Sequence, residues 1–68
     1  MIKCHLSTIM GSHKMKIADV SRETGLNRST ITALYNEDAQ RVDFDTIDKL
    51  CKLFSCTVPD LFEWVDES

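Results

Sequence analysis

The sequence contains only two glycines and one proline among its 68 residues, so few positions interrupt regular secondary structure. No apolar run approaches the roughly 20 residues that span a bilayer, and no membrane contact is expected. The apolar residues near Met1 are interrupted by Lys3, His5 and Ser7, unlike the apolar core of a secretory signal peptide. We therefore expect a compact, helix-rich protein located in the cytoplasm.

Cysteine is also sparse, and the three thiols show no paired spacing: Cys4, Cys51 and Cys56. An odd number without such spacing argues against a disulfide framework, and a zinc site needs four soft ligands at short spacings. We expect free, buried cysteines, no metal and no cofactor. The two histidines lack a nucleophile and an acid partner, and no glycine-rich phosphate loop is present, so no catalytic residues and no enzyme activity are expected.

Acidic residues outnumber basic ones, and the net charge of −3 counts against DNA as a ligand at first sight. The charges are unevenly distributed. Residues 1–41 hold six basic and four acidic residues, a balance of +2, whereas residues 42–68 hold two basic and seven acidic residues, a balance of −5. Such a chain can present one face to phosphate and hold the other away, and its acidic C-terminal half leaves a protein partner possible.

The spacing of apolar residues predicts five helices and an all-α fold, in one domain that covers residues 1–68. The first helix is expected over residues 2–11, where one stripe contains Ile2, Leu6, Ile9 and Met10. The others are expected over residues 16–24, 28–36, 44–54 and 58–64. The last two are expected to bury Phe44, Ile47, Leu50, Cys51 and Phe54, then Val58, Leu61 and Phe62.

Residues 17–36 carry the most informative pattern, that of two short helices joined by a tight turn. Ser21 is small enough to let the second helix approach closely. Gly25 supplies the positive φ that ends the first helix, and Leu26 fills the gap between the two. Ile31 and Leu34 bury the inner face of the second helix. The pattern is typical of the helix-turn-helix and points to DNA.

Capping signals support these helix boundaries. Asn27 and Asp43 are good N-caps, because their side chains accept hydrogen bonds from first-turn N–H groups. Thr57 and Asp60 have the spacing of a capping box, and Pro59 is tolerated in a first turn whose N–H groups have no helical partner.

Together these motifs resemble the lambda repressor and Cro-like helix-turn-helix family, over nearly all of the chain. Residues 27–34 are similar to its recognition helix, and residues 44–54 and 57–62 to its last two helices. The resemblance implies a compact five-helix, lambda-repressor-like domain with the helix-turn-helix at helices two and three, and double-stranded DNA as partner. Ile17 stands where the family often has a glutamine that meets phosphate, and Lys16 where a hydroxyl cap is common.

The outer face of the second of these two helices would read bases in the major groove. Arg28 suits a bidentate contact to guanine, and Asn27 a contact to adenine. The full set of expected base contacts is Asn27, Arg28, Ser29, Thr32, Ala33 and Asn36. Each has a structural alternative: Asn27 and Asn36 also fit helix ends.

Phosphate contacts are expected from side chains around this helix, namely Lys14, Lys16, Thr30, Tyr35 and Arg41. The two lysines stand at the start of the preceding helix, which lies against the DNA backbone in this fold, and Arg41 follows the recognition helix. Any of the three is equally a solvated surface charge, and Thr30 is alternatively part of the cap.

The end of the chain holds two large aromatic residues, Phe62 and Trp64. Phe62 is expected in the core, whereas Trp64 and Val65 are expected at a homodimer interface. A chain of this length buries only about 60% of its unfolded surface, so dimerisation is a common remedy. A twofold dimer would place two recognition helices one DNA turn apart.

The function predicted from the sequence is a sequence-specific, DNA-binding transcriptional regulator, a repressor that acts as a dimer on operator DNA. The alternative is a protein-interaction module or antitoxin-type regulator on the same scaffold, favoured by the net charge of −3 and the missing glutamine. A third possibility is that the chain is a fragment of a larger regulator.

Overall fold

Within residues 1–66, five short helices form the body of the protein, and at the start of all but the first a side chain accepts a hydrogen bond from a backbone N–H. The computed structural model describes residues 1–66. Its helices are α1 (Leu6–Ser12), α2 (Ile17–Thr24), α3 (Arg28–Tyr35), α4 (Phe44–Phe54) and α5 (Val58–Leu61). Asn27 accepts a hydrogen bond from the Ser29 N–H at 2.8 Å and Asp43 one from the Thr46 N–H at 2.9 Å, which confirms both predicted caps.

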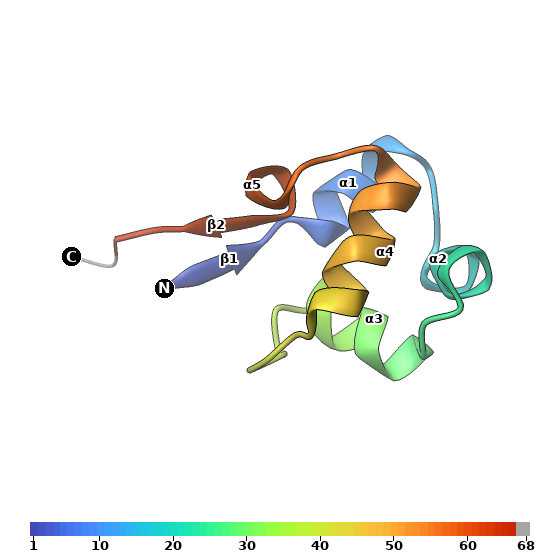
Figure 1. The fold of residues 1–68 in the computed structure, drawn as a ribbon, viewed down its shortest axis with the longest axis horizontal. Helices are drawn as coiled ribbons and strands as arrows, with labels where there is room; N and C mark the ends of the chain where they lie inside the picture. The colour runs from blue at the N-terminus through green and yellow to red at the C-terminus, as the bar shows by residue number, and fades with distance from the viewer. Residues whose placement is uncertain (67–68) are drawn as a thin grey trace.

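The two ends of the chain meet in a small antiparallel sheet, so the predicted all-α fold is confirmed only in part: the body is helical, but two strands are added to it. Strand β1 (Ile2–Cys4) pairs with β2 (Phe62–Trp64), and the partners are Ile2 with Trp64, Lys3 with Glu63 and Cys4 with Phe62. Figure 1 shows this sheet as an arm that projects from the helical body. The expected helices over residues 2–11 and 58–64 are therefore shorter, because each gives up three residues to a strand.

The core lies where all five helices converge. It is formed by Leu6 and Met10 of α1, with Val20, Ile31, Leu34, Leu50, Phe54 and Leu61 from the other four helices. Phe62, Ile9 and Ile17 pack against this cluster while partly exposed. The sequence stripes predicted the members of this cluster that come from α1, α3, α4 and α5, because a side chain that repeats at helical spacing reaches the same face each turn.

Three residues expected in the core lie on the surface instead. The exposed fractions are 61% for Ile2, 89% for Phe44 and 50% for Val58. Ile2 is exposed because it belongs to the arm, while Phe44 and Val58 occupy the first positions of their helices, beyond the core. Thr46 is 5% exposed and takes the buried position one turn before Leu50. No helix within residues 1–66 is long and apolar enough to cross a membrane.

Candidate nucleic-acid interface

A tight turn fixes how α3 follows α2. Gly25 adopts φ +77° and its N–H donates to the Ser21 carbonyl at 2.8 Å, which closes the last turn of α2. The Ser21 hydroxyl donates to the Leu26 carbonyl at 2.7 Å, and Leu26 packs against the core. Ser21, Gly25 and Leu26 thus occupy the positions in the turn that the sequence predicted for them.

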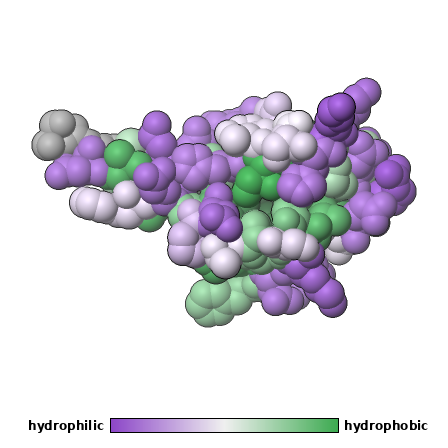
Figure 2. Space-filling view, turned by 90° about the horizontal axis from the view of Figure 1, so that it is seen from above, coloured by the Kyte–Doolittle hydropathy of each residue, from purple (hydrophilic) through white to green (hydrophobic). Residues whose placement is uncertain are grey.

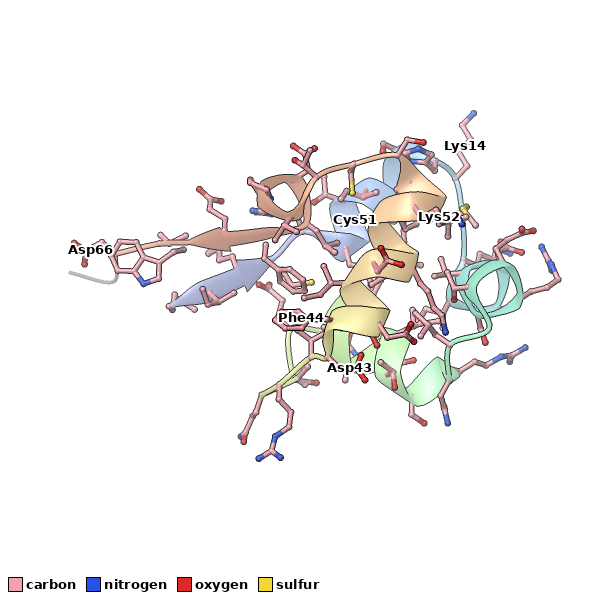
Figure 3. The ribbon with its side chains drawn as sticks, in the orientation of Figure 1. Lys14, Asp43, Phe44, Cys51, Lys52 and Asp66 are labelled. Carbon is pink, nitrogen blue, oxygen red and sulfur yellow. The ribbon has the colours of Figure 1, made fainter. Side chains whose placement is uncertain are left out.

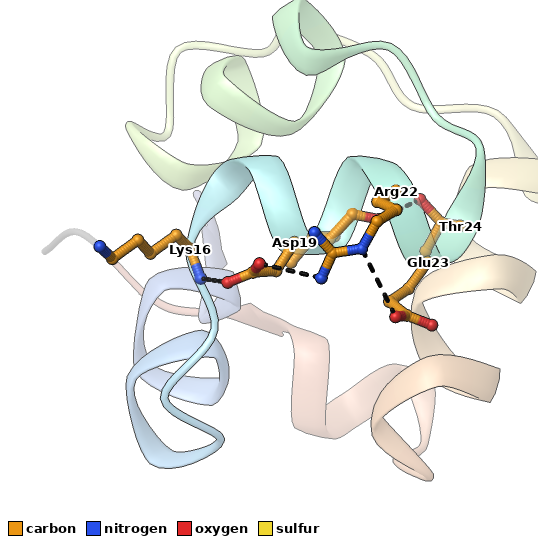
Figure 4. Close-up of polar contacts among 6 residues, drawn as sticks. Lys16, Asp19, Arg22, Glu23 and Thr24 are labelled. Atoms are coloured by element: carbon orange, nitrogen blue, oxygen red, sulfur yellow. Dashed lines mark hydrogen bonds and ion pairs between the residues drawn. The ribbon is translucent and has the colours of Figure 1, made fainter.

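The start of α2 presents a lysine to solvent. Its backbone N–H, at Lys16, donates to the Asp19 carboxylate at 2.9 Å, and this bond together with Arg22 lowers the pKa of Asp19 below its usual range. Figure 4 shows that Arg22 also reaches Asp19, with Nη2 3.1 Å from Oδ1, and approaches Glu23 with Nε 3.9 Å from Oε1. Two acids thus offset the charge of Arg22, whereas the Lys16 side chain points away from them.

Arg28 is the basic residue at the exposed start of α3. Its guanidinium makes no ion pair or side-chain hydrogen bond within residues 1–66, in contrast to that of Arg22. The side chain of the preceding Asn27 is occupied as the helix cap. An exposed arginine without a protein partner retains all five donors, which suits the bidentate recognition of guanine.

The outer surface of α3 is less uniform than the sequence predicted. Asn27, Arg28, Ser29 and Asn36 are exposed, but Thr32 and Ala33 are half-buried. Thr32 and Ala33, which the sequence places on the exposed face of this helix, are partly covered because they flank the residues that α3 buries. Their half-exposed surfaces suit contact with a thymine methyl group better than a long-reaching hydrogen bond.

Two grooves bring together most of the expected phosphate contacts. One lies between α3 and α4, and its lining includes Ser29, Thr30, Ala33 and Arg41. The other lies beside the start of α2, where Lys16 shares the lining with Tyr35, the last residue of α3. Basic side chains therefore stand on both sides of α3, the arrangement needed to grip the two phosphate backbones that border a major groove.

One expected phosphate contact lies apart from this group. Figure 3 shows that Lys14 extends from the connection between α1 and α2, at the opposite side of the molecule from α3. The lining of the α3–α4 groove also includes Asp43 together with Arg41. Hydrogen bonds from Thr46 lower the pKa of Asp43, so the carboxylate is charged and opposes phosphate at that point.

The sequence pattern missed Phe44 as a surface residue. It is 89% exposed at the first position of α4, next to Asp43 (Figure 3). The signal that identifies it is the cap: a residue that directly follows an N-cap stands ahead of the turn that enters the core.

The expected dimer residues lie on the arm. Trp64 is 68% exposed, while Val65 is half-buried. The Val65 backbone is bonded to Met1, with its N–H 2.8 Å from the Met1 carbonyl and its carbonyl 2.7 Å from the N-terminal ammonium. Only the side chain of Val65 therefore remains for a second molecule, whereas Trp64 offers its side chain and its backbone.

The cysteines and histidines are dispersed. Within residues 1–66, no three His, Cys, Asp or Glu side chains gather closely enough to hold a metal ion. The three thiols are free and half-buried, although full burial was expected, and burial raises the pKa of Cys4 and of Cys56. His5 Nε2 lies 2.8 Å from Glu63 Oε1, and the His13 ring packs edge-on against Phe54.

A small helical body with two helices meeting at a glycine turn, and an unpaired arginine at the start of the second, is the architecture of a DNA-binding regulator. The sequence model of the Cro/C1-type helix-turn-helix DNA-binding domain matches residues 5–67. The chain therefore belongs to the Cro/C1-type helix-turn-helix family, as its motifs predicted. No curated protein sequence matches the chain.

Proposed function

We propose that the chain is a sequence-specific transcriptional regulator whose α2 and α3 form the helix-turn-helix, with α3 as the recognition helix. The observation that carries the proposal is the guanidinium of Arg28, which has no partner within residues 1–66 and stands at the exposed start of α3. An arginine at this place in a helix that enters the major groove meets base edges first.

The contacts follow from the two kinds of surface around α3. Base reading falls to Arg28 together with the other outer residues, Asn27, Ser29, Thr32, Ala33 and Asn36. Phosphate binding falls to Lys16 and Tyr35 on one side of α3 and to Thr30 and Arg41 on the other, because these residues line the grooves that flank it. The side chain of Lys14 lies at the opposite side of the molecule from α3 (Figure 3), so it is left out of the proposed phosphate contacts.

The proposed regulator binds as a homodimer and represses transcription by occupying operator DNA. Trp64 and Val65 supply the proposed contact between copies, since Trp64 is a large apolar side chain that is 68% exposed. A twofold dimer matches a palindromic operator with half-sites about 10 base pairs apart. We further propose that residues 1–68 act as one domain, and that the chain works in the cytoplasm.

The test is selection of bound duplexes from a random pool at roughly 0.15 M salt, a concentration that suppresses nonspecific attraction. The wild type and two variants, Arg28→Ala and Arg22→Ala, are compared in parallel. We expect the wild type to enrich one motif and Arg22→Ala to enrich the same one, because Asp19 and Glu23 already engage Arg22. Arg28→Ala is expected to lose the preference at one or two positions of each half-site.

The strength of that loss is also predictable. On the preferred site, Arg28→Ala should cost about 1–3 kcal/mol of binding free energy, the usual value of a bidentate contact to a base pair. An equal loss on preferred and random duplexes would assign Arg28 to phosphate binding. No enrichment by the wild type would reject sequence-specific recognition.

A protein-binding role is the second candidate, because Phe44 is 89% exposed and flanked in sequence by Asp43 and Asp45. An exposed aromatic residue among carboxylates suits a partner that offers an apolar pocket bordered by basic residues. Failure of the pool selection would favour this candidate. Its binding surface would be the acidic side of α4 rather than α3.

A further inference from the structure

The arm has hydrogen-bonding groups that nothing in the described chain uses. Met1 and Val65 exchange two hydrogen bonds, and the His5 N–H donates to the Leu61 carbonyl at 2.8 Å. In an antiparallel ladder, bonded pairs alternate with pairs whose N–H and C=O groups point outward. The pairs Ile2–Trp64 and Cys4–Phe62 fall between the bonded ones, so their backbone groups point to the outer edges of the arm.

The two outer edges differ in how far they are covered. On β1, the Cys4 N–H donates to Glu37 Oε1 at 3.1 Å, and the residues that follow α3 border a groove along this strand. On β2, the Phe62 N–H donates to the Val58 carbonyl. Trp64 is different, because its N–H and C=O both point outward from β2 and have no partner within residues 1–66.

The side chains of the arm divide by chemistry between its two faces. Partners across an antiparallel pair share a face, which places Ile2, Cys4, Phe62 and Trp64 together. Ile2 and Trp64 are 61% and 68% exposed. In the view from above, Figure 2 shows hydrophobic surface among hydrophilic residues along the projecting arm. A two-stranded sheet with an exposed apolar face is marginal alone and gains stability from additional strands.

We propose that two copies of the chain join through the outer edges of their β2 strands, with Trp64 opposite Trp64 of the second copy. The product is a continuous four-stranded antiparallel sheet, in which each Trp64 N–H donates to the Trp64 carbonyl of the other copy. The two tryptophans then lie side by side on the apolar face, where a cross-strand aromatic pair is favourable. This proposal rests on the dimer proposed above and specifies its interface.

Charge and hydrogen bonding disfavour two of the other symmetric registers. A pairing centred on Phe62 needs its N–H, which is already bonded to Val58. A pairing centred on Glu63 sets two carboxylates directly opposite each other, which is destabilising. The pairing centred on Trp64 sets Glu63 opposite Val65 of the second copy, so that no like charges face each other at this pair.

The shape of the molecule permits this pairing. The arm projects from the body along the longest axis of the chain, and α5 lies at the base of β2 rather than along its outer half (Figure 1). Antiparallel pairing of two such arms sends the two helical bodies to opposite ends of the joined sheet. The outer edges of both β2 strands are then paired with each other, which removes the hazard that a further chain pairs at β2.

The register is tested by substituting Val65, because its partner in the proposed sheet is a carboxylate. Val65→Lys would create two ion pairs with Glu63 per dimer, and Val65→Glu two repulsive pairs. Relative to the neutral reference Val65→Thr, we expect Lys to tighten and Glu to weaken dimerisation by about 2- to 30-fold each, the range for two cross-strand pairs. Sedimentation equilibrium without DNA measures the dissociation constants.

The role of the backbone is tested at Trp64 itself. Trp64→Thr keeps the outward N–H, whereas Trp64→Pro removes it without removing a donor to β1, since proline is tolerated at the solvent side of an edge strand. We expect Trp64→Pro to be a folded monomer and Trp64→Thr to retain weak dimerisation. Circular dichroism checks that each variant is folded.

Three results would overturn the proposal: a wild type that stays monomeric at the highest concentrations, equal dimerisation of the two Trp64 variants, or shifts of the same sign for Val65→Lys and Val65→Glu. The outcome is independent of DNA. A wild type that dimerises as described but binds no duplex would reject the proposed function and leave the interface intact. DNA binding by a chain that never dimerises would reject the proposed interface and leave the proposed DNA binding intact.

Discussion

Three of the helices in this protein begin with a carboxylate that accepts a backbone hydrogen bond. Asp19, Asp43 and Asp60 each accept a backbone hydrogen bond at the first turn of α2, α4 and α5. These bonds favour the charged form, so the pKa of each aspartate is lowered. Because the folded-state pKa values lie below those of the unfolded chain, the stabilisation is complete above the unfolded pKa of about 3.9 and is lost as the pH falls through the folded values.

A substitution at one cap makes this pH dependence measurable. Asp43→Asn keeps an N-cap acceptor but removes the titrating group, so the urea midpoint should fall less between about pH 6 and about pH 2 than it does in the wild type. Asp43→Ala is the control, since it removes the acceptor and should lower the midpoint at both ends of this range. Parallel losses for the wild type and Asp43→Asn would contradict the role of Asp43.

The sequence predicts the caps at Asp43 and Asp60 because a cap is local: the carboxylate and the N–H from which it accepts a hydrogen bond are three residues apart. It fails at Phe44 and Thr46, where the decisive factor is how α4 is rotated against the core. Thr46 repeats with Leu50 and Phe54 at four-residue spacing on the buried face. A pattern based on apolarity assigns that face to Phe44 and overlooks a threonine.

At the scale of elements, the two glycines differ in the backbone conformation that their positions require. Gly25 adopts φ +77° at the end of α2, a conformation that side chains with a Cβ rarely take. Gly11 lies within α1. A Cβ at either position would meet no atom within 4 Å, so only the backbone distinguishes the two.

The two positions should therefore respond in opposite directions to alanine. Gly25→Ala is expected to destabilise the fold by about 1–2 kcal/mol, the cost of a left-handed conformation. Gly11→Ala is expected to stabilise it by about 0.5–1 kcal/mol, because alanine favours the helix. Thermal unfolding of both variants beside the wild type measures the difference. A stabilised Gly25→Ala would show that the turn does not need a positive φ.

The elements that the sequence predicts poorly are those made by distant partners. Ile2 and Leu6 satisfy a helical spacing, yet residues 2–4 form a strand because residues 62–64 pair with them. Nothing within a helical window records a partner about sixty residues away. By contrast, Ser21, Gly25 and Leu26 define the α2–α3 turn within six residues, and their roles are predictable from the local sequence alone.

At the scale of the whole molecule, charge separates the proposed DNA surface from the rest. Residues 1–41 carry a balance of +2 and residues 42–68 one of −5. The exposed Lys16, Arg28 and Arg41 stand around α3, whereas the exposed Asp43, Asp45 and Asp48 stand at the start of α4 and along it. A molecule with net charge −3 attracts DNA weakly from a distance, so recognition depends on the orientation of α3 and on base contacts.

That dependence gives the most direct test of the account. The measurement is the ratio of affinities for the selected duplex and for a shuffled duplex of the same composition, at roughly 0.15 M salt. We predict at least about a 10³-fold preference for the selected duplex, the lower bound for specific regulators. Equal affinity for the two duplexes would contradict the claim that α3 reads sequence.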